Sequence, residues 1–280
     1  MRRTLANVGC VLAVVAAALP ACAGAPSSGS APPSYEDYRG VLMGFVDDHG
    51  LVDYAGLRAQ EWGIDDVVTS LGTLAPKVYD RWSEKDKIAF WINAYNALTL
   101  KAIIDHYPID PATPNLSYPK NSIRQITGVW DQARVTVMGQ QMTLGFIEAK
   151  ILRRDFREPR IHVALVCAAL SCPKLRNEPY EGAKLDEQLD DQARAFLADP
   201  RNLRIDRAGN RVRASEIFKW YADDFLPAPA KPGDAGDGEH RALAAFAAKY
   251  VSEADRAFLA GTAYRIEYAT YDWTLNEQTH

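Results

Sequence analysis

The chain has 280 residues, of which 48% are hydrophobic and 24% are charged, and its formal net charge is −4. Residues 34–280 are enough for one large domain with its own core. The chain has no basic stripe, which argues against nucleic acid as a partner. Beyond the N-terminal segment, no stretch approaches the roughly 20 apolar residues that a membrane-spanning helix needs.

Residues 1–22 have the pattern of an export signal. Arg2 and Arg3 supply its positive end, and Val11–Leu19 is an apolar stretch too short to span a bilayer. The segment is followed by residues 23–33, which are small, uncharged and rich in Pro and Gly. Such a composition predicts a flexible tether between the signal and the domain over 34–280.

The end of the signal resembles the lipobox of bacterial lipoproteins. It reads Leu19-Pro20-Ala21-Cys22, which predicts a lipid anchor on Cys22, and Ala23 favours the outer over the inner membrane. Ordinary cleavage around Ala21 is the alternative. Both predict an exported protein on the periplasmic side of a bacterial membrane, and the first adds the membrane itself as a partner.

Helical periodicity, capping residues and turn signals predict the elements that follow. The strongest helix begins at Ser83, with Asp86 three residues later, and it is apolar on nearly every side. Helices and strands are segregated, which predicts a single α+β domain with this helix buried on a mostly antiparallel sheet. Helices are expected over Tyr35–Asp47 with Ser34 as N-cap, Ser83–His106, Leu144–Arg154, Leu185–Leu197, Ser215–Tyr221 and Arg241–Val251. Strands are expected over Arg134–Met138, Gln141–Thr143, Ile161–Cys167, Leu203–Ile205, Arg211–Arg213 and Tyr264–Tyr271, and an exposed loop over Pro227–Gly238.

Two cysteines and a histidine mark the candidate site. His162 and Cys167 lie on the apolar run that is expected to be a strand. Positions of opposite parity face opposite sides of a strand, and these two would lie about 16 Å apart. Without a bulge they cannot form a Cys/His dyad. Cys167 would then pack as a small hydrophobe or form half of a disulfide.

Cys172 follows in a turn with Ser171 and Pro173. A local bridge between Cys167 and Cys172 is geometrically feasible, and an oxidising compartment would favour it. The alternative is a nucleophilic Cys172. Ser171 is a weaker candidate nucleophile because no G-x-S-x-G elbow surrounds it.

Other polar residues could support a site. Asn93 and Asn96, on the apolar central helix, either bond loop backbone and fix the architecture or serve a cleft. Glu148 either pairs with Arg153 or orients His162 as the third member of a triad. Trp220 and Asp224 are expected to pack and to form a helix-end turn. No His or Cys spacing typical of a metal site is present, and no cofactor is expected.

Five blocks resemble the family called domain of unknown function 547. They are F-W-I-N-A-Y-N-A-L-T-L, T-L-G-F-I-E-A-K-I-L-R, I-H-V-A-L-V-C-A-A-L-S-C-P-K-L, A-S-E-I-F-K-W-Y-A-D-D-F and Y-D-W-T-L-N, in order from Phe90 to Asn276. The chain departs from the family at Ala149, where a histidine is usual. The resemblance implies no settled activity.

A looser analogy is to papain-like and transglutaminase-like folds, in which a helix carries the nucleophilic cysteine and a following strand carries the histidine. Asn93 falls about where that cysteine would be, so the analogy implies either a nucleophile at Cys172 or a scaffold that binds without cleaving.

Three functions remain open from the sequence. The favoured hypothesis is a non-catalytic cell-envelope module that binds a peptide, glycan or protein in a cleft beside His162. The second is a thiol-dependent hydrolase or acyl transferase with Cys172 or Cys167 as nucleophile, His162 as base and Glu148 as orienter. The third is a structural lipoprotein whose cysteines only staple a turn.

Overall fold

The computed structural model describes residues 34–226, 238–261 and 263–279, and it confirms the α+β class. The expected signal, the tether and Cys22 lie outside the described residues, as does most of the expected loop over 227–238. No helix in the described ranges is long and apolar enough to cross a membrane. The α-helices are α1 (Glu36–Phe45), α2 (Tyr54–Ala59), α3 (Trp62–Thr73), α4 (Pro76–Tyr79), α5 (Glu84–Ile104), α6 (Leu144–Phe146), α7 (Leu185–Ala198), α8 (Ile217–Trp220), α9 (Ala222–Phe225), α10 (Gly238–Ala247) and α11 (Glu253–Leu259). The strands are β1 (Val135–Val137), β2 (Gln140–Met142), β3 (Leu203–Asp206), β4 (Arg211–Ser215) and β5 (Arg265–Ala269), and the other helical turns are η1 (Ile123–Gln125), η2 (Ile147–Phe156), η3 (Pro159–Val163) and η4 (Gly182–Lys184).

Helix α5 is the buried centre of the fold, as its apolar sequence predicts. The Ser83 hydroxyl accepts a hydrogen bond from the backbone N–H of Asp86 at 3.1 Å, which caps the first turn. The helix packs mainly against other helical segments, α2, α3, η2 and η4 among them. The expectation that it lies on the sheet was therefore wrong. The sheet is too short to cover a 21-residue helix, and α7 and α8 contact it instead.

The main sheet has the order β3-β4-β5. β3 and β4 form the expected antiparallel hairpin, with Leu203 opposite Ala214, whereas β5 joins β4 in parallel, with Val212 opposite Ile266. β1 and β2 form the second predicted hairpin, which turns at Gly139 with a φ of 72°. Tyr35 holds the N-cap position of α1 without a side-chain cap, and the Ser34 hydroxyl accepts from the N–H of Glu36, the first residue of the helix, at 3.4 Å.

The predicted strand over Ile161–Cys167 is not formed. The chain there makes the 3₁₀ turn η3 and then an irregular buried segment, in which Ala168 has a φ of 60°. An apolar run fits any buried backbone, so its composition could not separate a strand from this path. The prediction that His162 and Cys167 face opposite sides assumed a regular strand, so it does not apply to this backbone.

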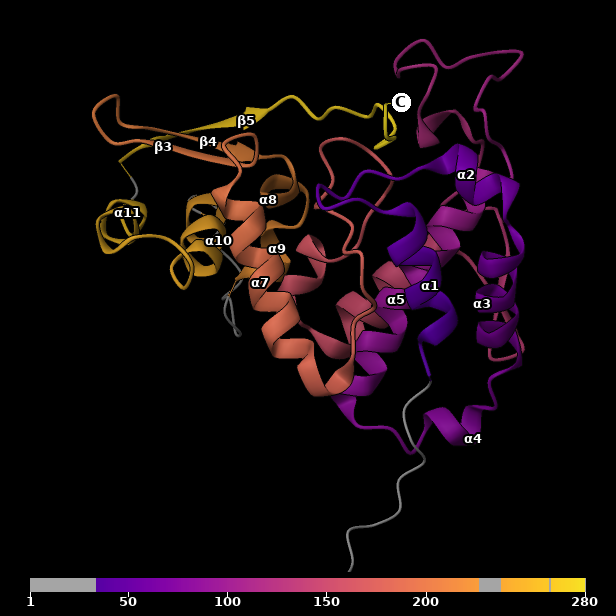
Figure 1. Ribbon diagram of the computed structural model, residues 1–280. Helices are drawn as coiled ribbons and strands as arrows, with labels where there is room; N and C mark the ends of the chain where they lie inside the picture. The colour runs from indigo at the N-terminus through magenta and orange to yellow at the C-terminus, as the bar shows by residue number, and fades with distance from the viewer. Residues whose placement is uncertain (1–33, 227–237, 262, 280) are drawn as a thin grey trace, which may run out of the picture.

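The C-terminal segment ties the two sides of the molecule together. In Figure 1 it runs from β5, beside α10 and α11, across the top towards α2. Leu275 bridges Ala169, and Glu277 bridges Val52 beside the N-terminal helices. The side chain of Asn276 accepts from the Tyr54 hydroxyl at 2.8 Å and donates to the Gly50 carbonyl at 3.2 Å.

Candidate functional site

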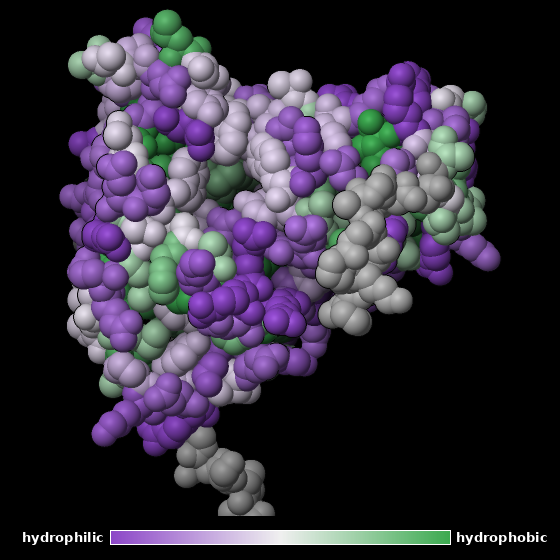
Figure 2. Space-filling model, turned by 180° about the vertical axis from the view of Figure 1, so that it is seen from behind, coloured by the Kyte–Doolittle hydropathy of each residue, from purple (hydrophilic) through white to green (hydrophobic). Residues whose placement is uncertain are grey.

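An aromatic cleft of about 550 Å³ lies beside His162. Its volume falls within the range of small-molecule sites. Figure 2 shows a hollow bordered by pale residues of intermediate hydropathy on the face seen from behind. The aromatic lining consists of Tyr95, Tyr118, Trp130, Trp220, Tyr221, Tyr271 and Trp273, and the polar lining includes Arg124, Glu148, His162 and Cys167.

His162 is fixed at the base of the cleft by three neighbours. Its Nε2 lies 2.8 Å from Oδ2 of Asp224. Its ring stacks on Tyr221 with centroids 4.0 Å apart, and the edge of Phe225 lies against it at 5.3 Å. Only 2% of the side chain is exposed. The bond from Nε2 to the carboxylate and the two ring contacts hold the imidazole in one orientation.

Asp224 is shared between His162 and Arg153. The Arg153 guanidinium donates from Nε to the same Oδ2 at 2.5 Å. Burial of Asp224 raises its pKa, but the hydrogen bonds from His162 and Arg153 outweigh burial and lower this pKa to about 2. Asp224 is therefore ionised at neutral pH and orients the imidazole.

Glu148 does not orient His162, contrary to the triad hypothesis, and it does not pair with Arg153. Its carboxylate accepts from the Tyr221 hydroxyl at 2.7 Å and from the Tyr95 hydroxyl at 3.4 Å. The ring of Tyr221 thus separates Glu148 from the imidazole. Residues 147–156 form the π-helix η2, which carries both Glu148 and Arg153 and is a backbone form common at functional sites.

Gly145, just before η2, allows the backbone to pack closely against the backbone of Trp130 in the cleft wall. Its N–H donates to the Trp130 carbonyl at 2.8 Å, and an added Cβ would lie only 2.8 Å from the same oxygen. Any larger residue would push Leu144–Phe146 away from Trp130. Ala149 also lines the cleft with its methyl group.

Arg124 is the cationic group of the cleft. Its guanidinium lies over the rings of Tyr118, Trp273 and Trp130, at 4.5, 5.1 and 5.4 Å from their centroids. Its side chain donates to the Tyr118 hydroxyl at 2.7 Å. Within the described residues, no carboxylate lies within salt-bridge distance of it. The remaining N–H groups can bind an anion that enters the cleft.

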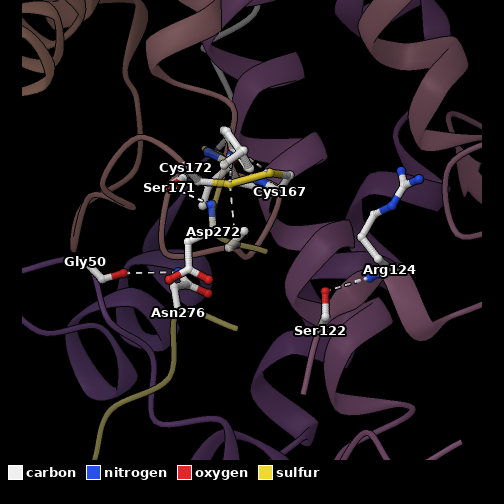
Figure 3. The surroundings of a disulfide bond; sticks show 12 residues. Gly50, Ser122, Arg124, Cys167, Ser171, Cys172, Asp272 and Asn276 are labelled. Carbon is white, nitrogen blue, oxygen red and sulfur yellow. Dashed lines mark hydrogen bonds between the residues drawn. A yellow bond between two sulfur atoms is a disulfide. The ribbon is translucent and has the colours of Figure 1, made fainter. Parts of the chain in front are cut away.

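Cys167 and Cys172 are joined by a disulfide, which confirms the sequence alternative of a local bridge. Cys167 lines the aromatic cleft together with His162, while Cys172 is largely buried. Figure 3 shows the bridge near Ser171, whose hydroxyl accepts from the backbone N–H of Asp272 at 2.8 Å. Ser171 therefore holds the C-terminal segment in place beside the bridge.

Asn93 and Asn96 bond loop backbone. Asn93 donates to the carbonyl of Tyr180 at 2.8 Å and accepts from its N–H at 2.9 Å. Asn96 donates to the carbonyl of Ala164 at 3.0 Å and accepts from the N–H of Val166 at 2.9 Å. Asn96 thus positions the segment between His162 and Cys167.

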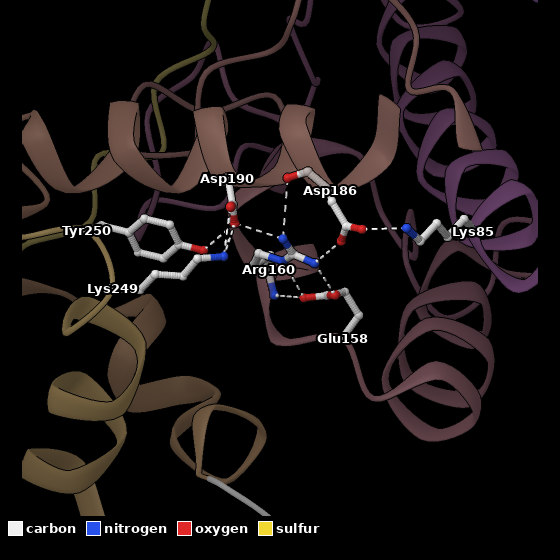
Figure 4. Close-up of polar contacts among 7 residues, drawn as sticks. All are labelled: Lys85, Glu158, Arg160, Asp186, Asp190, Lys249 and Tyr250. Carbon is white, nitrogen blue, oxygen red and sulfur yellow. Dashed lines mark hydrogen bonds and ion pairs between the residues drawn. The ribbon is translucent and has the colours of Figure 1, made fainter. Parts of the chain in front are cut away.

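Arg160 anchors the same segment from its other end. It binds Glu158 at 2.7 Å, Asp186 at 2.8 Å and Asp190 at 2.8 Å, as Figure 4 shows. Hydrogen bonding to Glu158, despite the opposing effect of burial, raises the pKa of Arg160 further above its ordinary value. The η3 turn that carries His162 is therefore tied to α7.

Several cleft residues escaped the sequence analysis. Tyr95, Tyr271 and Trp273 lie inside family-like blocks, which was a usable signal. Arg124 and Trp130 belong to no such block; Arg124 lies in the short turn η1 and Trp130 in the turn that follows it. Trp220 is 43% exposed at the cleft rather than packed in the core, and it stacks on Trp273. In the part of the chain that the structure describes, no group of three or more His, Cys, Asp or Glu side chains is placed to hold a metal ion.

The fold and the site define an α+β domain with a disulfide in the wall of an aromatic cleft. Residues 79–197 match the family described as protein of unknown function, DUF547. No curated protein and no solved structure matches the chain. The matched region includes His162, Arg124 and both cysteines, whereas Asp224, Trp220 and Trp273 lie beyond it.

Proposed function

We propose that this protein is a cell-envelope binding module whose aromatic cleft takes a peptide or glycan that bears an acidic group. The observation that carries the proposal is the pairing of Arg124 with flanking aromatic rings in a cleft of about 550 Å³. A guanidinium binds a carboxylate through charge-assisted hydrogen bonds, and aromatic faces pack on the apolar faces of a peptide or a sugar ring.

Glu148 adds a second polar contact point. Two tyrosine hydroxyls hold its carboxylate, and within the described ranges no cationic side chain forms a salt bridge with it. It can accept hydrogen bonds from ligand hydroxyl or ammonium groups. A ligand that places an anionic group near Arg124 and hydrogen-bond donors near Glu148 would satisfy both charged side chains.

The bridge favours binding over thiol-dependent hydrolysis. A cysteine in a disulfide has no thiolate, and the thiolate is the nucleophile in such enzymes. The imidazole of His162 is held by Asp224 and stacked on Tyr221, which suits a rigid wall of a binding site. The proposal retains the export expected from residues 1–22 and the lipid anchor expected on Cys22, which together would keep the cleft on the periplasmic side of the outer membrane.

Tryptophan fluorescence can test the proposal, since three tryptophans line the cleft. The probes are N-acetylmuramic acid and an N-acetylated tripeptide, each compared with its amide derivative, which lacks the negative charge. We expect the acids to bind and Arg124→Gln to weaken them about tenfold or more, because a charge-assisted hydrogen bond contributes about 1.5–3 kcal/mol. Arg58→Gln, on an exposed turn of α2, is the matched control.

His162→Ala should also weaken binding, since it removes part of the base of the cleft. If acids and amides bind equally well, or if Arg124→Gln leaves the affinity unchanged, the cleft is not an acid-binding site. Absence of binding for all four probes would also count against the proposal.

A further inference from the structure

The disulfide adds little that the fold does not already supply. It closes a short loop, with a sequence separation of 5, and short loops gain the least from cross-linking. The loop has its own bonds: Leu170 N–H donates to Thr274 at 2.8 Å, and Cys172 N–H donates to Ala169 at 2.9 Å. Because these hydrogen bonds already hold the turn, stabilisation of the turn does not account for the disulfide.

The two sulfurs have different surroundings. Two backbone N–H groups point at Sγ of Cys172, from Cys167 at 3.1 Å and from Ala169 at 3.4 Å. The Tyr271 hydroxyl lies 3.4 Å from each sulfur. Burial raises the pKa of Tyr271 well above its ordinary value, so the hydroxyl keeps its proton and remains a donor. The hydroxyl has one proton for the two sulfurs, so the asymmetry among the described residues comes from the two backbone N–H groups at Cys172.

This asymmetry determines which sulfur would leave when the bridge opens. Hydrogen bonds to a thiolate stabilise it, and in thiol–disulfide exchange the better-stabilised thiolate is the faster leaving group. Cys172 is thus the leaving side. Cys167 is half-buried at the wall of the aromatic cleft, where an incoming group can reach it.

We propose that the Cys167–Cys172 pair is a thiol–disulfide exchange centre, which accepts a small thiol or a cysteinyl peptide from the aromatic cleft. The incoming thiolate attacks Sγ of Cys167, a new S–S bond forms there, and the bond to Cys172 breaks with its electron pair on Cys172. A second thiolate then attacks the incoming sulfur, which leaves as a disulfide with the second thiol. The two thiols are oxidised, the protein bridge gains two electrons, and two protons end on the cysteines.

A second cavity could offer the opposite route. Cys172 borders a smaller polar pocket of about 240 Å³ together with His49 and Lys174. A thiolate that entered there would attack Cys172 instead. The site of the first adduct therefore tests the proposal directly.

The experiment uses the oxidised protein and glutathione as the probe thiol. The reaction is quenched with acid, free thiols are alkylated, and peptide mass spectrometry locates glutathione and alkyl label. We expect glutathione on Cys167 and alkyl label on Cys172, in at least tenfold excess over the reverse. Adducts mainly on Cys172, or no reaction until the protein is denatured, would overturn the proposal and leave a structural bridge.

Tyr271→Phe provides a second measurement. Loss of the hydroxyl should slow exchange about fivefold, whereas Tyr264→Phe, a buried tyrosine whose hydroxyl contacts the Leu259 carbonyl, should not change the rate. An unchanged rate in folded Tyr271→Phe would contradict the role of the hydroxyl. If that variant fails to fold, the position of the adduct in the unmodified chain still decides. Because glutathione is itself an acidic peptide, the assay is repeated with uncharged 2-mercaptoethanol, whose exchange does not depend on acid binding. Exchange with this thiol can fail while acid binding through Arg124 succeeds, and the reverse.

Discussion

Asp224 links two side chains that lie far from it in the sequence. Its Oδ2 accepts from His162 and from Arg153, and Arg153 also lies over the ring of Tyr221 at 5.0 Å. The cluster closes the base of the cleft with one anion between two donors. Removal of the carboxylate would leave a guanidinium and an imidazole without their shared acceptor.

Asp224→Asn tests this cluster. The pKa of Asp224 falls from an ordinary 3.8 to about 2, which corresponds to about 2 kcal/mol of folding free energy. A lowered carboxyl pKa contributes stability above pH 4, and that contribution is lost as the pH falls from about 4 to about 2. Urea unfolding should therefore show a destabilisation of about 2 kcal/mol at pH 7 that shrinks towards zero near pH 2.

Asp223→Asn is the matched control, because Asp223 is the exposed neighbour on the same helix. It should change the free energy of unfolding by less than about 0.5 kcal/mol at either pH. A difference between Asp224→Asn and the unmodified protein that stays constant down to pH 2 would contradict the lowered pKa.

At the scale of elements, α5 acts as the frame on which the site segment is fixed. Asn93 and Asn96 lie about one turn apart on the same side of the helix. They bond the backbone of Tyr180 and of the segment from Ala164 to Val166. These amides are buried, so their backbone partners have no water to replace them. The helix thus sets the path that leads from His162 to Cys167.

Asn96→Ala should destabilise the fold by about 3 kcal/mol, since it leaves one buried carbonyl and one buried N–H unpaired at about 1–3 kcal/mol each. Chemical denaturation measures this loss. Thr99→Ala is the control, because Thr99 is buried on the same helix and its hydroxyl donates to the Tyr95 carbonyl within that helix. Its removal should cost about 1 kcal/mol or less. Equal losses in the two variants would contradict the framing role of Asn96.

At the scale of the whole molecule, the C-terminal segment joins the sheet to the N-terminal helices. Tyr271 and Trp273 line the cleft on the way, and Leu275 and Asn276 then reach Ala169 and Tyr54. The cleft wall and the long-range closure of the fold therefore depend on the same short stretch.

Deletion of residues 275–280 should loosen both contact points together. Hydrogen exchange should become fast at the amide of Val52, which donates to Asn276, and at nearby amides of the 168–170 turn. Deletion of only residues 279–280 is the control, because Thr279 is exposed. Protection at Val52 that survives the longer deletion would show that the segment does not close the fold.

Much of the local structure could be predicted from the sequence. Helix α5 and its Ser83 cap, both hairpins and the Cys167–Cys172 bridge depend on residues a few positions apart, and periodicity, turn chemistry and cysteine spacing report such contacts. The tertiary structure alone decided that Asp224 rather than Glu148 meets His162 from 62 residues away, that residues 161–167 bend instead of forming a strand, and that Arg124 lies among rings from distant segments. These outcomes depend on long-range packing, which selects among backbone paths and partners that are locally equivalent.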